Sequence, residues 1–140
     1  MASTETAAPP AIELIEALQS VQGKLESALE PLGLSLAKLG LLDKLAKAGG
    51  PVPLRTLPEL CACVRSNITQ LVDRLEAAGL VERTDDPDDR RQKRAEITEA
   101  GRASHAEGVR VLLEAEEQLF SGLSTERRDA LLGMLRALRV

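Results

Sequence analysis

Aromatic side chains are almost absent from the sequence, which has one Phe and neither Tyr nor Trp. A core without rings has to be packed from Leu, Ala, Val and Ile, and this composition favours packed helices over a large sheet. With Phe120 as the single aromatic residue, the sequence also excludes sites that stack successive bases or sugars on several rings.

Cysteine, histidine and long apolar runs are also scarce. Two cysteines are too few for a disulfide scaffold and suit a reducing compartment, so we expect a cytoplasmic protein. No apolar run approaches the roughly 20 residues that cross a bilayer, and the N-terminal residues lack the features of a secretory signal. One histidine and no tyrosine leave few acid–base groups, and no catalytic motif is present. We therefore predict no enzyme, no catalytic residue and no cofactor.

The charges are nearly balanced overall but segregated along the chain. A length of 140 residues with 44% hydrophobic and 29% charged residues indicates one globular domain, and the formal net charge is −4. After aspartates at 85, 86, 88 and 89, the segment Arg90-Arg91-Gln92-Lys93-Arg94 holds four basic residues in five. A local patch of this density can contact phosphates, although the chain as a whole is acidic. The alternative interpretation is a solvated loop.

Apolar residues recur at steps of three and four near both ends of the chain, which predicts amphipathic helices. We expect helices over residues 12–32, from a capping Ser35 to Gly49, over 99–120 after a capping Thr98, and after a capping Ser124. One core of this size cannot bury all of these apolar stripes. We therefore expect a homodimer formed by residues 11–33 and 99–140, with residues 1–10 as a flexible N-terminus.

The pattern changes in the middle of the chain. Residues 56–61 predict a very short helix, and residues 65–78 predict a longer one with an apolar inward face. Residues 80–84 and 95–98 alternate, which predicts two strands of a β-hairpin, the only sheet expected. Two helices, a tight turn and a hairpin form a winged helix-turn-helix domain, here residues 34–98. The predicted fold class is mainly α with a small β-hairpin wing, flanked by N- and C-terminal dimerisation helices.

The outward face of the helix predicted at 65–78 is polar. Arg, Asn and Gln side chains make paired hydrogen bonds to base edges in the major groove, and Ser and Thr suit phosphates. The alternative is an ordinary solvated helix face. The residues on this face are Arg65, Ser66, Asn67, Thr69, Gln70, Asp73 and Arg74.

Three segments together resemble the MarR family of bacterial winged-helix regulators. They are ITQLVDRLEAAGLVER at 68–83, DPDDRR at 86–91 and ITEAG at 97–101. The order of the predicted elements matches that family over nearly the whole chain. The resemblance implies a dimeric transcription factor, usually a repressor, that binds a pseudo-palindromic operator in double-stranded DNA. It also implies release from the DNA by a small lipophilic ligand, bound near the helix at 35–48, or by oxidation.

The family pattern also suggests roles for individual residues. The wing arginine that enters the minor groove corresponds to Arg91, and Asp73 is expected to hold it in position. We assign wing support to Asp73 and Asp89. The expected DNA-binding residues are Arg65, Ser66, Asn67, Thr69, Gln70, Arg74, Arg90, Arg91 and Lys93.

Cys61 and Cys63 are candidate redox sensors, because some regulators that resemble this chain sense oxidants through thiols. The alternative is that both are buried thiols that fill space beneath the helix-turn-helix. A zinc site needs four ligands, and His105 is the one histidine available besides these two cysteines, so we expect no metal. His105 itself is assigned no role, and the aspartates at 85–89 lack the glycine and glutamate of a calcium loop.

A second function remains open on the sequence alone. The net charge of −4 is compatible with a helical dimeric interaction module whose winged domain binds protein rather than DNA. Salt dependence separates the two functions, since each phosphate contact steepens the fall of DNA affinity with salt.

Overall fold

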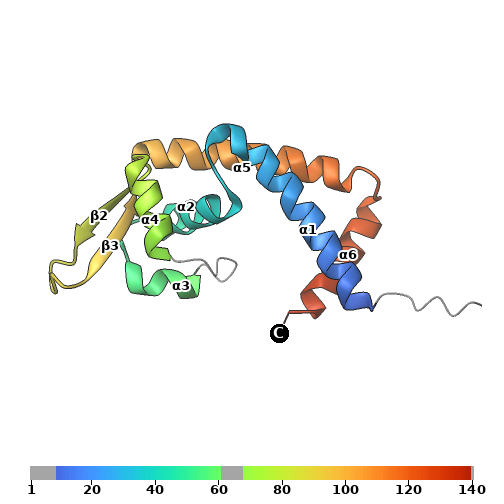
Figure 1. Ribbon diagram of the computed structural model, residues 1–140, viewed down its shortest axis with the longest axis horizontal. Helices are drawn as coiled ribbons and strands as arrows, with labels where there is room; N and C mark the ends of the chain where they lie inside the picture. The colour runs from blue at the N-terminus through green and yellow to red at the C-terminus, as the bar shows by residue number, and fades with distance from the viewer. Residues whose placement is uncertain (1–8, 61–67, 140) are drawn as a thin grey trace, which may run out of the picture.

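The computed structural model describes residues 9–60 and 68–139, with only the backbone of Glu59 and Leu60 (Figure 1). Helix α5 forms the long axis of the molecule, with the winged part beneath its N-terminal half and α1 and α6 at its other end. The mainly helical fold with a small wing is confirmed. The helices are α1 (Pro10–Leu29), α2 (Leu36–Ala48), α3 (Leu57–Leu60), α4 (Ile68–Ala77), α5 (Glu99–Phe120) and α6 (Thr125–Ala137).

Hydroxyl side chains cap three of these helices as expected. Ser35 Oγ accepts a hydrogen bond from Lys38 N at 3.1 Å and begins α2. Thr98 Oγ1 accepts from Gly101 N at 3.0 Å at the start of α5. Ser124 Oγ accepts from Arg127 N at 3.2 Å at the start of α6. Each cap satisfies one of the amides that a helix N-terminus leaves without an intrahelical partner.

The sheet has three antiparallel strands rather than two. Strands β2 (Val81–Asp85) and β3 (Lys93–Ile97) form the predicted hairpin, in register from Val81 opposite Ile97 to Asp85 opposite Lys93. The expectation that the hairpin is the whole sheet was wrong, because β1 (Val52–Pro53) pairs with the other side of β3. Two residues are too few to show an alternating pattern, and a proline is tolerated in a strand at a sheet edge.

The core is aliphatic and lies in the winged part of the chain. The inward face predicted for α4 is confirmed, since Leu71, Val72 and Leu75 are buried and Ile68 is partly buried. The largest fully buried side chains come from the end of α1 and from α2, α3 and α4: Leu29, Leu41, Leu42, Leu45, Leu57, Val72 and Leu75.

Two short 3-10 turns connect these elements, η1 (Glu30–Leu32) after α1 and η2 (Leu54–Thr56) before α3. Gly79 follows α4 with a φ of +75°, a left-handed conformation that glycine adopts without strain, and the chain turns there into β2. Within residues 9–60 and 68–139, no helix is both long and apolar enough to cross a membrane.

Candidate nucleic-acid interface

Helix α4 separates its side chains by character, because a period of 3.6 residues places its apolar positions on one face. Leu71, Val72 and Leu75 point into the core. The opposite face is exposed and carries Thr69, Gln70, Asp73 and Arg74. The other candidate residues of this region lie outside the described residues: Arg65, Ser66, Asn67, Cys61 and Cys63.

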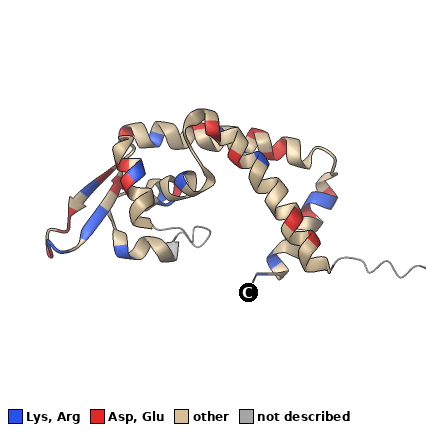
Figure 2. Ribbon diagram, viewed as in Figure 1, with Lys and Arg blue, Asp and Glu red and all other residues tan. Residues whose placement is uncertain are grey.

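The wing loop, residues 86–92, is closed by its own main chain. Asp86 N donates to Gln92 O at 2.9 Å, and Gln92 N donates to Asp89 O at 2.9 Å. The Asp89 carboxylate accepts from Arg91 N at 3.1 Å, so Asp89 supports the loop through the backbone. The side chains of Arg90 and Arg91 remain exposed at the turn. Figure 2 shows basic residues at this outermost point of the winged part.

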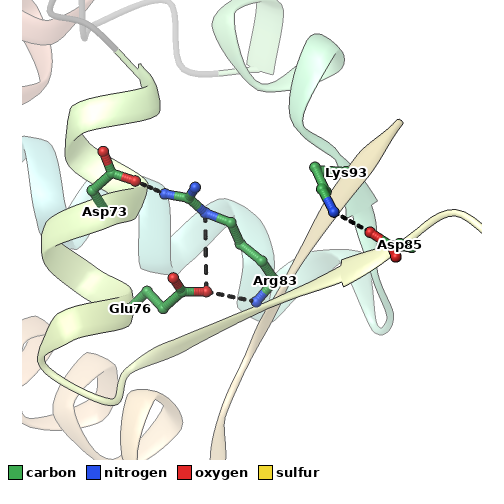
Figure 3. A network of polar contacts seen from close by, with 5 residues as sticks. All are labelled: Asp73, Glu76, Arg83, Asp85 and Lys93. Carbon is green, nitrogen blue, oxygen red and sulfur yellow. Dashed lines mark hydrogen bonds and ion pairs between the residues drawn. The ribbon is translucent and has the colours of Figure 1, made fainter. Parts of the chain in front are cut away.

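An ion-pair network joins α4 to the base of the wing (Figure 3). Arg83 reaches from β2 toward α4, where its Nη2 is ion-paired with Asp73 Oδ1. Glu76 Oε2 lies 4.0 Å from Arg83 Nε and accepts a hydrogen bond from Arg83 N at 3.2 Å. Both carboxylates come from α4 and lie one turn apart, so one arginine connects the helix to the strand at two points.

We expected Asp73 to hold Arg91 in position. This expectation was wrong, since Asp73 pairs with Arg83 instead. Arg83 lies in the strand that returns past α4 directly after the turn at Gly79, whereas Arg91 lies at the far end of the hairpin. Lys93, a predicted DNA contact, has its ammonium ion-paired with Asp85 across the two strands. Both side chains of that pair are half exposed.

His105, to which the sequence analysis gave no role, connects two helices. Its Nε2 lies 2.9 Å from Asp43 Oδ1, so the side chains of α5 and α2 meet although the residues are 62 positions apart. Lys47 Nζ donates to Asp43 Oδ2 at 2.8 Å. Burial raises the pKa of the Asp43 carboxyl, but the hydrogen bonds and the electrostatic attraction of Lys47 and His105 together outweigh burial and leave it below the ordinary value of 3.8. No local sequence signal marks this contact.

The structure has a groove with a volume of about 730 Å³ between α1 and α5. The effector cleft was expected elsewhere, near residues 35–48. On that helix Leu39, Leu41, Leu42 and Leu45 are packed in the core. Among the described residues, no group of three or more His, Cys, Asp or Glu is arranged to hold a metal ion. The groove is lined by Ser20, Gly23, Lys24, Ser27, Ala28, Ala115, Gln118 and Leu119.

Comparison with known proteins shows which family this geometry resembles. The model of the MarR family matches residues 32–92, which include α2, α4 and the wing loop. A solved MarR-family transcriptional regulator from Rhodococcus sp. RHA1 is 27% identical, with a TM-score of 0.81 and coverage of 97% of this chain and 96% of that one. The chain is similar to MarR-family regulators in sequence over residues 32–92 and in fold over nearly its whole length.

Two other transcriptional regulators are similar to this chain. The repressor CouR, solved bound to a 23-mer DNA duplex, is 27% identical, with a TM-score of 0.83 and coverage of 99% of this chain and 97% of that one. YkoM of Bacillus subtilis, an uncharacterized HTH-type transcriptional regulator, is 30% identical over 87 residues. That match covers 62% of this chain and 56% of YkoM, just over half of the relative.

Proposed function

We propose that this chain is a regulator of the MarR type, a dimer that binds DNA and represses transcription from a pseudo-palindromic operator. The observation that carries the proposal is the ion-paired unit of α4 and the wing, in which Arg83 connects to Asp73 and Glu76. This unit presents an exposed polar helix face together with a loop of exposed arginines. Such a combination suits simultaneous contact with a major groove and the neighbouring backbone. The similarity to CouR, which was solved on DNA, supports it.

In this proposal α4 is the recognition helix. Gln70 is suited to paired hydrogen bonds with an adenine edge, and Arg74 to contacts with guanine or phosphate. Thr69 is suited to a phosphate or a thymine methyl group. Arg65, Ser66 and Asn67, which precede the described part of the helix, complete the proposed set.

The wing supplies the second contact. Arg91 has a long, flat guanidinium that fits a narrow minor groove, where the potential is most negative over A·T-rich sequence. Arg90 and Lys93 are proposed to contact phosphates. The Lys93–Asp85 ion pair is half exposed, so the lysine can exchange this partner for a phosphate at little cost. The basic residues act locally, and the net charge of −4 does not prevent binding.

Dimerisation is supported by apolar side chains that one chain leaves in solvent. Helix α1 exposes 53% of Leu18, α6 exposes 61% of Met134, and Leu138, the C-cap of α6, is 60% exposed. A set of this kind, distributed over two helices outside the winged part, is typical of a protein interface. We propose residues 11–33 and 99–140 as the dimerisation region and residues 34–98 as the DNA-binding domain. The other large exposed apolar residues of these two helices are Ile12, Leu14, Ile15, Val21 and Leu135.

We propose that release from the operator follows binding of a small lipophilic ligand or oxidation. The groove between α1 and α5 offers mixed apolar and hydroxyl walls for a ligand. A panel of hydrophobic and phenolic compounds tests the first route through a rise in melting temperature together with loss of DNA binding. Loss of binding on peroxide treatment, reversed by a reductant, supports the thiol route instead.

A gel-shift titration with the DNA upstream of this protein's own gene, at two salt concentrations, tests the proposed function. We expect a discrete complex whose affinity falls with salt at a log–log slope of about −0.9 per phosphate contact. A winged domain that binds protein instead would give no complex at either salt concentration.

A further inference from the structure

Helix α5 meets the winged part at a very close approach. A Cβ atom at Gly108 would lie 2.8 Å from Leu39 Cδ1 and 2.9 Å from Leu34 Cδ1. Glycine at this position therefore lets α5 lie directly against the beginning of α2. Apolar contact of this kind holds two helices together but does not by itself fix one rotation between them.

The polar contact between His105 and Asp43 lies on the same α2–α5 contact, three residues before Gly108 on α5. Both side chains are mostly buried, with 20% of His105 and 29% of Asp43 exposed. Lys47 orients the carboxylate from its other oxygen at 2.8 Å. A hydrogen bond between partly buried groups has a preferred direction. The contact therefore selects one rotation of α5 relative to α2, which apolar packing alone does not define.

The two helices belong to different parts of the molecule. Helix α2 supplies Leu41, Leu42 and Leu45 to the core of the winged part. Helix α5 extends beyond that core toward the end of the molecule where α1 and α6 lie (Figure 1). The angle between α2 and α5 therefore sets where α4 and the wing lie relative to the dimerisation helices.

We infer that Asp43 and His105 are positioning residues for operator recognition: their contact fixes the angle of the winged part on α5, and through it the separation of the two recognition helices in the dimer. This inference rests on the proposed function. Neither residue is proposed to contact DNA. Their effect is on which spacing between operator half-sites the dimer accepts, because each added base pair rotates one half-site by about 35° relative to the other.

The experiment measures affinity for operators whose half-sites are one base pair closer, at the natural spacing, or one base pair further apart. We expect His105→Ala to reduce the preference for the natural spacing by about fivefold, the equivalent of one lost hydrogen bond. His105→Gln retains a side-chain N–H donor and should restore much of the preference. Arg110→Ala is the matched control, since among the described residues this exposed residue of α5 pairs only with Glu107 and Glu114 on its own helix.

The outcomes separate the inference from the proposed function. If the wild-type protein binds no operator, the proposed function fails. If it binds with a spacing preference that His105→Ala leaves unchanged, or if both His105 variants weaken all three operators equally, the positioning role is overturned. Asp43→Leu, which has a side chain of similar size but no acceptor for His105, makes the same prediction and replaces His105→Ala if that variant does not fold.

Discussion

Asp73 on α4 is ion-paired with Arg83 on the first strand of the wing. The pair is only partly shielded, with 24% of the Arg83 side chain and 55% of the Asp73 side chain exposed. A contact of this kind contributes little to global stability. Its consequence is geometric, since the helix and the wing keep one relative orientation.

Arg83→Ala should therefore weaken operator binding more than it lowers the free energy of unfolding, which we expect to change by less than about 1 kcal/mol. Asp73→Asn should have a smaller effect in the same direction, and the double variant should be less than additive because both act through one contact. Fluorescence anisotropy and urea denaturation measure the two quantities. Glu82→Ala, an exposed neighbour on β2, is the control. Additive losses would show that the two residues act independently.

Arg91→Ala should weaken binding to operator and scrambled duplexes alike, and reduce the magnitude of the log–log salt slope by about one contact per subunit. Gln70→Ala should instead act at particular operator positions, at a cost of roughly 1–3 kcal/mol where a base contact is lost. Anisotropy at two salt concentrations distinguishes these patterns. If Arg91→Ala binds both duplexes as tightly as the wild type, the minor-groove role of Arg91 is wrong and the side chain is only solvated.

The lowered pKa of Asp43 predicts how the free energy of unfolding changes in acid. Its pKa lies below 3.8 in the folded chain, so its contribution to stability is fully present above that value and is lost as the pH falls through the lowered pKa. Asp43→Asn should therefore destabilise the protein by about 1 kcal/mol at pH 7. This difference from wild type should shrink below pH 3.8. Denaturant titrations at several pH values measure it, and a difference that stays constant into acid would contradict the ionic contact.

Gly101 on α5 should not tolerate a larger side chain. A Cβ there would lie 2.1 Å from Leu80 O and 2.7 Å from Ile97 Cγ1, so the backbone after the α4–β2 turn would have to move. We expect Gly101→Ala to lower the free energy of unfolding by about 1–3 kcal/mol. Gly40→Ala in α2, where a Cβ meets nothing within 4 Å, should raise it by up to about 1 kcal/mol. Thermal denaturation compares them, and equal melting temperatures would contradict the close approach.

The sequence predicted the features that depend on neighbouring residues. The caps at Ser35, Thr98 and Ser124, the whole extent of α5 and the hairpin all follow from local patterns that the structure confirms. The inward face of α4 follows from helical periodicity in the same way.

What the sequence did not predict depends on pairing between distant segments. Strand β1 has two residues and acquires its conformation from β3. Asp73 has several arginines within reach along the chain, and only the path of β2 past α4 selects Arg83. His105 and Asp43 lie 62 residues apart, and no spacing rule connects them. Partners of this kind are determined by tertiary packing.

Leu18→Glu on α1 should weaken the dimer, because it places a charge where 53% of an apolar side chain is exposed in one chain and is proposed to be covered by a second. Light scattering across a dilution series should show at least about a tenfold rise in the dimer dissociation constant. Gln19→Ala, on the exposed surface of the same helix, should leave it unchanged. A wild-type chain that is monomeric at micromolar concentration would contradict dimerisation itself.

The central claim is that a dimer reads two half-sites with α4 and the wing. Hydroxyl-radical and methylation footprinting of the upstream DNA tests this claim most directly. We expect two protected major-groove segments about 10 base pairs apart, each flanked by minor-groove protection that disappears in Arg91→Ala. Uniform protection along the duplex, or none at concentrations that saturate the gel shift, would contradict it.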